Sequence, residues 1–162
     1  MWLSRLIAIS TLVWLSACAG LEIKSLGQAL YEQNAVIEVV QADGRNGQLY
    51  SRQLRSRLSF DQSAATHNVS STLSVSSSST LSVRGSSSDL KKKTMTAAFT
   101  VVDRASGEVV MSDSLSASAT LGTVSAEFAK LRSDRHADER LALLLADRVA
   151  ARIHLFFTQS GS

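Results

Sequence analysis

Four basic side chains near the middle of the chain are the first candidates for chemistry. Arg84 and the run Lys91, Lys92 and Lys93 flank a glycine- and serine-rich turn. Guanidinium and ammonium groups bind phosphates and carboxylates through charge-assisted hydrogen bonds, so this cluster could be an anion-binding tip. Lysines also protect sheet edges against aggregation, so a solvated edge is the structural alternative. Both interpretations stay open at this point.

The single cysteine, Cys18, is the second candidate. An apolar run from Leu6 to Leu15 follows the basic Arg5 and is shorter than the roughly 20 residues of a membrane-spanning helix. It suits the apolar region of a signal peptide. Because small residues precede Cys18, the sequence Leu15-Ser16-Ala17-Cys18 resembles the lipobox of bacterial lipoproteins, in which diacylglycerol is joined to the thiol.

We therefore predict that residues 1–17 are a lipoprotein signal peptide, that Cys18 is the lipidation site and that 18–34 form a lipidated tether. The alternative is a secretory signal with an accidental cysteine. More than one acyl chain gives stable membrane attachment. Ala19 follows the cysteine in place of the aspartate typical of inner-membrane retention, so we expect an outer-membrane anchor on the periplasmic side.

No spacing in the chain matches a catalytic or metal-binding motif. The nucleophile elbow, the HExxH zinc motif, glycine-rich phosphate loops and EF-hand spacing are all missing. The three histidines are scattered, and one cysteine cannot form an intramolecular disulfide or a CxxC site. We expect a protein that is not an enzyme, with no metal and no cofactor beyond the diacylglycerol and N-acyl lipid on Cys18.

Composition limits the classes of partner that we expect for this chain. With 162 residues the chain is one domain, and aromatic residues make up only 6%, which disfavours base stacking on nucleic acid. Cleavage after residue 17 removes one basic residue and lowers the net charge from +3 to +2. The basic cluster is therefore not a consequence of overall charge.

Period-two patterns predict most of the sheet. A β-branched run at 35–40 predicts a short first strand. Residues 59–88 contain thirteen serines, but apolar residues fall on odd positions from Val69 to Val83, which predicts a long half-buried strand in place of a linker. Ser77 and Ser79 interrupt the apolar face and predict either a bulge or a thin patch of core there. The same alternation predicts strands at 90–102 and 109–121, joined by a tight hairpin at 103–108.

Helical periodicity appears twice. Leu54 and Leu58 belong to a short amphipathic helix at 48–58, and apolar residues spaced three and four apart from Phe128 to Phe157 predict a long C-terminal helix. The order β-α-β-β-β-α predicts an α+β two-layer sandwich, with both helices on one face of a four-stranded mixed sheet. The domain spans 35–157, and 158–162 are predicted to be a disordered tail.

The order and spacing of these features resemble the LPS-assembly lipoprotein family LptE, over about residues 35–157. The resemblance is carried by the lipobox-like segment, the Leu-x-x-x-Leu helix ending at Leu58, the hairpin Asp103-Arg104-Ala105-Ser106-Gly107-Glu108-Val109-Val110, and the last helix, Ala126 to Phe157. One departure concerns contacts with a partner: family members often have Gly-Phe-x-Pro-Leu-Tyr after the cysteine, whereas Ala19-Gly20-Leu21 stands here.

The resemblance implies a lipoprotein that plugs the LptD outer-membrane β-barrel, helps to assemble it, and assists insertion of lipopolysaccharide (LPS) into the outer leaflet. It also implies that Arg84, Lys91, Lys92 and Lys93 contact LPS, which carries phosphates and sugar acids. The alternative is a free-standing periplasmic lipoprotein that binds a small ligand or inhibits an enzyme. In either case the membrane attachment is a lipid anchor and no nucleic acid is expected.

Overall fold

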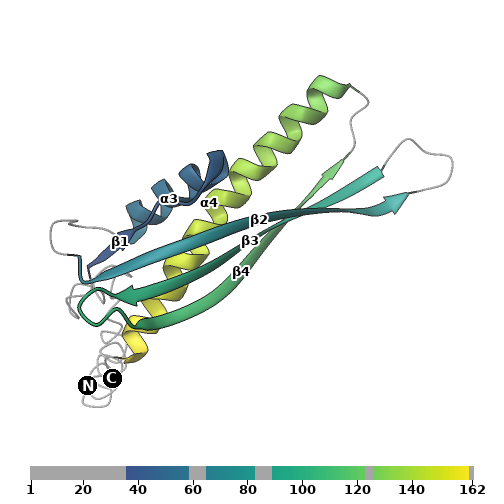
Figure 1. Cartoon of the computed structure of the whole chain (residues 1–162). Coiled ribbons are helices and arrows are strands. Elements are labelled where there is room, and N and C mark those ends of the chain that lie inside the picture. Colours follow the sequence, from purple (N-terminus) through teal and green to yellow (C-terminus); the bar gives the residue numbers. More distant parts are fainter. Residues whose placement is uncertain (1–35, 59–64, 83–88, 123–125, 161–162) are drawn as a thin grey trace, which may run out of the picture.

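The computed structural model describes residues 36–58, 65–82, 89–122 and 126–160, and the predicted signal peptide and most of the tether lie outside these ranges. The elements follow the predicted order β-α-β-β-β-α, which confirms the α+β fold (Figure 1). They are β1 (Ile37–Val39), α3 (Gly44–Leu58), β2 (His67–Ser82), β3 (Asp89–Asp103), β4 (Val109–Gly122) and α4 (Glu127–Ser160).

The four strands form one mixed sheet in the order β1-β2-β3-β4. β1 runs parallel to β2, whereas β2–β3 and β3–β4 are antiparallel. The serine-rich segment is a strand that pairs with β3 from His67 to Ser82, and its register shifts between Ser79 and Leu81. Both the strand and the irregularity are therefore as predicted. Regular alternation of apolar and polar residues specifies this pairing because a slip by one residue would bury serines.

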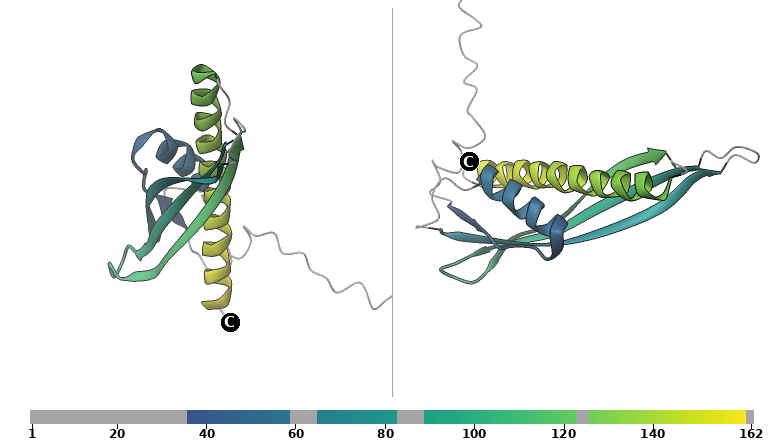
Figure 2. Two further views of the ribbon diagram at one scale, coloured as in Figure 1. Left: turned by 90° about the vertical axis from the view of Figure 1, so that its right-hand side faces the viewer. Right: turned by 90° about the horizontal axis from the view of Figure 1, so that it is seen from above.

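Both helices lie on the same face of the sheet (Figure 2). α4 has 34 residues, which corresponds to about 50 Å at 1.5 Å per residue. It runs beside α3 and crosses the sheet towards the far ends of β3 and β4. We call this end, opposite to β1, the distal end of the molecule.

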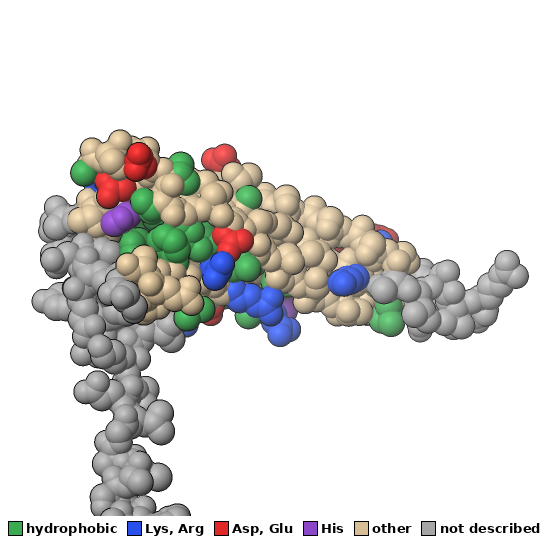
Figure 3. All heavy atoms as spheres, turned by 90° about the horizontal axis from the view of Figure 1, so that it is seen from below, with side chains coloured by type: hydrophobic (Ala, Val, Ile, Leu, Met, Phe, Trp, Pro, Cys, Tyr) green, Lys and Arg blue, Asp and Glu red, His purple; other side chains and the backbone are tan. Residues whose placement is uncertain are grey.

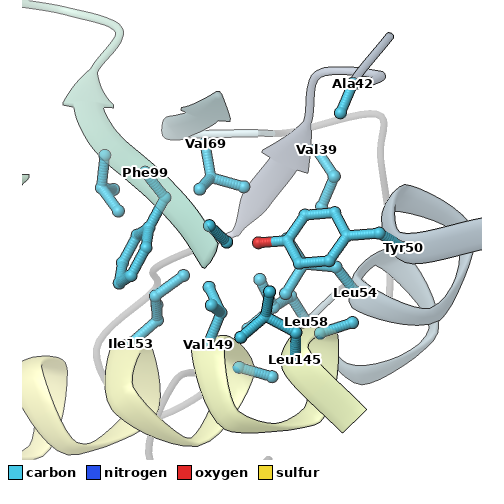
Figure 4. Close-up of a cluster of buried hydrophobic side chains, with 14 of the residues drawn as sticks. Val39, Ala42, Tyr50, Leu54, Leu58, Val69, Phe99, Leu145, Val149 and Ile153 are labelled. Carbon is cyan, nitrogen blue, oxygen red and sulfur yellow. The ribbon is translucent and has the colours of Figure 1, made fainter. Parts of the chain in front are cut away.

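Odd-numbered residues of the long strands form the sheet side of the core. Met95, Ala97, Phe99 and Val101 of β3 are buried against α4 and α3. The helices contribute apolar side chains one turn apart, and Figure 4 shows the meeting of the two layers. The helical members of this core are Tyr50, Leu54 and Leu58 of α3 and Leu141, Leu145, Val149, Ile153 and Phe157 of α4.

Two helix boundaries differ from the sequence-based prediction. α3 begins at Gly44 and not at Gln48, so Gly44 and Gly47, which precede the predicted helix, belong to its first turn. A Cβ atom on Gly47 would lie 2.6 Å from the carbonyl oxygen of Ala42, so glycine is needed for this close approach.

α4 continues to Ser160, so the prediction of a disordered tail from 158 is wrong for its first three residues. The Thr158 hydroxyl donates to the Leu155 carbonyl at 2.8 Å, and the Ser160 hydroxyl donates to the Phe156 carbonyl at 3.0 Å. The Ser160 hydroxyl also lies 3.4 Å from the Phe157 carbonyl oxygen, one of the last four carbonyls, which have no partner within the helix. Residues 161 and 162 lie outside the described ranges.

Candidate ligand-binding surface

The predicted basic tip is divided between two faces of the sheet. Lys91, Lys92 and Lys93 lie within β3, opposite Ser79, Ser78 and Ser77 of β2. Successive strand residues point to opposite faces, so the lysines alternate. The three lysines therefore lie near one end of the β2–β3 ribbon, as predicted, but they do not share one face of it. Arg84 lies outside the described residues.

Lys93 is buried beneath α4, with 7% of its surface exposed. Its Nζ atom lies 2.8 Å from Asp138 Oδ1 and 3.8 Å from Asp134 Oδ1, and it donates a hydrogen bond to the Asp134 carbonyl oxygen at 3.2 Å. The contact with Asp138 is an ion pair without hydrogen-bond alignment, because Asp138 Oδ1 has no hydrogen-bond partner. Lys93 thus holds α4 to the sheet.

Lys91 shares one of these carboxylates, that of Asp134. Its Nζ lies 3.8 Å from Asp134 Oδ2, and its side chain is only about one-third exposed, at 36%. Asp134 and Asp138 are one turn apart on α4 and therefore face β3 together. Two of the three lysines therefore form ion pairs with α4, Lys93 in a buried position and Lys91 in a partly exposed one.

Lys92 points to the opposite, solvent-facing side of β3 and is exposed. Its neighbours across the sheet are Ser78 and Thr120. The ion pairs formed by the described residues do not include Lys92. It is the described lysine of the predicted cluster that remains available to a ligand.

A second surface at the distal end was not anticipated as a binding site. Phe128 and Leu131, in the first turns of α4, are 72% and 64% exposed. The Arg132 guanidinium lies 5.5 Å from the centre of the Phe128 ring. Lys130 and Arg135 are also exposed here. These five residues, which we call the α4 distal surface, combine apolar and basic side chains.

Phe128 and Leu131 follow the apolar spacing that predicted this helix, yet both are exposed. Periodicity identifies which residues share a helix face, but it does not show how far the opposing sheet extends. The core contribution of α4 begins at Ala137. The available signal was the interleaving of three basic residues with two large apolar ones.

A groove lies between β4 and α4. Its volume is about 700 Å³, and its walls are Ser118–Leu121 of β4 and residues 133–147 of α4. Ala119, Leu121, Leu141 and Leu144 make much of this lining apolar, whereas Arg140 supplies a cation.

The described residues contain no group of three or more His, Cys, Asp or Glu side chains that could hold a metal.

His154 is buried between α4 and the end of α3, where its Nε2 lies 3.4 Å from the Arg57 carbonyl oxygen. Burial lowers the pKa of His154, so the neutral ring is favoured. No helix among the described residues is long and apolar enough to cross a membrane.

The chain resembles several solved lipoprotein structures. A protein from Caulobacter crescentus CB15 described as a lipoprotein superposes with a TM-score of 0.60 at 22% identity, covering 82% of this chain and 95% of that one. Rare lipoprotein B from Shewanella oneidensis gives 0.61 at 14% identity, with 79% and 98% covered. A minor lipoprotein from Acinetobacter baumannii gives 0.54 at 13% identity, with 74% and 90% covered.

No protein-family model matches the sequence, and no curated protein matches it. At identities between 13% and 22%, the likeness establishes a shared fold. The chain thus has the α+β fold of these bacterial lipoproteins, and almost the whole of each of them is matched.

Proposed function

We propose that this chain is an outer-membrane lipoprotein that plugs an LptD-type β-barrel, helps to assemble it and assists LPS insertion into the outer leaflet. The observation that carries the proposal is the outer face of the sheet. Across the middle of β2, β3 and β4 this face consists almost wholly of serine, threonine and alanine. Hydroxyl groups pair across the strands, with Ser70 and Thr100 at 2.8 Å and Thr94 and Ser118 at 2.9 Å.

Such a face suits a wet, polar barrel lumen. Barrel interiors are polar, and small hydroxylated side chains can lie close to the wall while their hydrogen bonds remain satisfied. In the view of Figure 3, most of the elongated distal part is covered by uncharged polar side chains and backbone, and basic side chains gather nearer the middle. The fold likeness to rare lipoprotein B supports an envelope lipoprotein.

Contact with LPS is proposed for Lys92, for Arg84 and for the α4 distal surface. Exposed ammonium and guanidinium groups match the phosphates and sugar acids of LPS, while Phe128 and Leu131 match its acyl chains. Lys91 and Lys93 are assigned a structural role because Asp134 and Asp138 already neutralise them.

Purification from outer membranes tests the barrel assignment. The affinity-tagged chain is solubilised in mild detergent, and co-purifying proteins are identified by mass. A stoichiometric β-barrel is expected, and barrel yield is expected to fall on depletion of the chain. Recovery without a barrel would favour the free-standing lipoprotein instead. Cys18→Ser provides the anchor control, and it is expected to abolish labelling by a palmitate analogue.

LPS binding is tested separately on the purified protein. Lys92→Ser combined with Arg132→Ser and Arg135→Ser is expected to weaken LPS binding severalfold at low salt, with a smaller deficit at high salt. The matched control is Arg45→Ser combined with Arg104→Ser, which removes exposed arginines at other sites. Equal weakening by both sets would show a general charge effect and contradict this site.

A further inference from the structure

Strand β4 is an edge of the described sheet, because β3 is its neighbour and none of the other described strands pairs with it. Residues Met111–Gly122 are matched to β3 without interruption. In an antiparallel ladder, alternate residues direct their N–H and C=O groups away from the partner strand. On β4 these outward-facing residues are the even-numbered ones.

Two hydrogen bonds establish this alternation. The Ser116 carbonyl oxygen accepts a bond from Arg148 Nη1 at 2.9 Å, and the Ser114 N–H donates to Asp113 Oδ1 at 2.8 Å. Both groups are therefore directed away from β3 and take no part in the β3–β4 pairing. Because the register is uninterrupted from Met111 onward, the main-chain groups of Ser118 and Thr120 also point outward.

Among the described residues, α4 covers only the first half of this edge. Arg148 and Arg152 of α4 reach across to Ser116 and Asp113, the latter at 2.8 Å. Beyond Ser116, no hydrogen bond from the described residues reaches the outward main-chain groups of Ser118 and Thr120. β4 also contains no Lys, Arg or Pro, the residues that commonly protect an edge from pairing.

The groove between β4 and α4 lies along this open half. One wall is Ser118–Leu121, and the other includes Ala137, Leu141 and Leu144. Main-chain donors and acceptors beside apolar pockets are the features that an added strand needs. An acyl chain would fill the pockets but would leave the main-chain groups unpaired.

Charge further defines the occupant. Arg140 lines the groove, and it is absent from the ion pairs among described residues. Asp147, the acidic residue of the groove, is already paired with Arg57 at 2.9 Å. The free charge of the groove is therefore positive, which favours a segment with an acidic side chain.

We propose that the open edge of β4, residues 118–122, together with the facing turns of α4, binds an extended segment of a partner protein by strand addition. The segment alternates apolar and polar residues and places an acidic residue near Arg140. This proposal requires neither the barrel nor LPS. Its test is therefore independent of the function proposed above.

The probe is an acetylated synthetic peptide of about nine residues, alternating valine and threonine with a central glutamate. A second peptide carries lysine in place of the glutamate. The full chain is held in phosphatidylcholine nanodiscs, and binding is followed by fluorescence anisotropy. The glutamate peptide is expected to bind about two- to fivefold more tightly than the lysine peptide, and Arg140→Gln is expected to remove this preference.

Proline substitution tests the edge itself. The Thr120 N–H points away from β3, so Thr120→Pro leaves the β3–β4 hydrogen bonds intact but deletes one donor to the added strand. This variant is expected to weaken peptide binding by about tenfold. The matched control is Ser112→Pro, which makes the same change on β4 outside the groove and is expected to bind like the parent. Circular dichroism verifies that both variants are folded.

Amide hydrogen exchange on the unmodified chain keeps the proposal testable if a proline variant unfolds. Saturating glutamate peptide is expected to protect the amides of Ser118 and Thr120 and to leave Ser112 unchanged. Absence of that protection overturns the proposal. Protection by sodium dodecanoate but not by peptide overturns it in favour of acyl chains. Protection that grows with protein concentration in the absence of peptide overturns it in favour of a second copy of this chain.

Discussion

The Nζ atom of Lys93 lies 2.8 Å from Asp138 Oδ1, beneath a helix that leaves the lysine only 7% exposed. Lys93 stands on the middle strand of the distal sheet, and Asp138 stands on the first turns of α4 that contact it. The distal part of α4 is therefore attached to the sheet by charge, whereas its C-terminal half is attached by packing.

Removal of Lys93 is expected to leave two carboxylates beside each other under α4. Lys93→Met should lower the free energy of unfolding by about 1–3 kcal/mol, below the value for a fully buried pair because Asp134 and Asp138 retain some solvent contact. Urea denaturation measures the change. Lys92→Met is the matched control on the exposed face, expected within about 0.5 kcal/mol of the parent. Equal effects of the two would refute the structural role of Lys93.

Tyr50 should titrate late and should link stability to alkaline pH. Burial raises its pKa from 10.0 to about 12, although the hydrogen bond with Ser71 opposes this. A tyrosine whose pKa is higher when folded keeps its proton longer than in the unfolded chain. Its contribution to stability is therefore complete below pH 10 and is lost as pH rises through about 12. Ultraviolet titration at the phenolate band detects the late group, which should be missing in Tyr50→Phe.

Gly47 should not tolerate a side chain. A Cβ atom at this position would lie 2.6 Å from the Ala42 carbonyl oxygen, which belongs to the backbone and cannot rotate away. Gly47→Ala is therefore expected to destabilise the fold by about 1–3 kcal/mol despite the better helix propensity of alanine. At Gly122 a Cβ atom would meet no other atom within 4 Å. Gly122→Ala should leave the melting temperature nearly unchanged, and a similar loss in both variants would argue against the close approach.

The ion pair between Asp113 and Arg152 should be lost when acid protonates the Asp113 carboxylate. The hydrogen bond from Arg152 lowers the pKa of Asp113, and the Ser114 N–H adds to this. A lowered folded pKa means that the contribution of this pair is present at neutral pH and is lost as pH falls through that value. Arg152→Gln is expected to raise the pKa of Asp113 towards its ordinary value of 3.8, as measured by carboxyl NMR titration. An unchanged titration would show that Arg152 does not set it.

Local patterns were sufficient for the element order. Period-two alternation identified β2 although the surrounding segment, residues 59–88, contains thirteen serines. A strand that buries one face requires this alternation, whichever polar residues occupy the other face. The helical period likewise identified α3 and α4. The boundaries at Gly44 and Ser160 depended on a backbone contact with Ala42 and on hydroxyl back-bonds, which leave no periodic signal.

The candidate surfaces required the tertiary structure. Alternation alone places Lys92 on one face of β3 and Lys91 and Lys93 on the other. Only the position of α4 above β3 shows that Asp134 and Asp138 form ion pairs with two of the three lysines. Phe128 continues the apolar stripe of α4 in sequence, yet it is exposed because the sheet no longer lies beneath it. The motif at Cys18 is local, since recognition of a lipobox depends on adjacent residues alone. The surface between β4 and α4 depends instead on how two segments that are distant in the sequence pack against each other. The spacing of neighbouring residues cannot predict that packing.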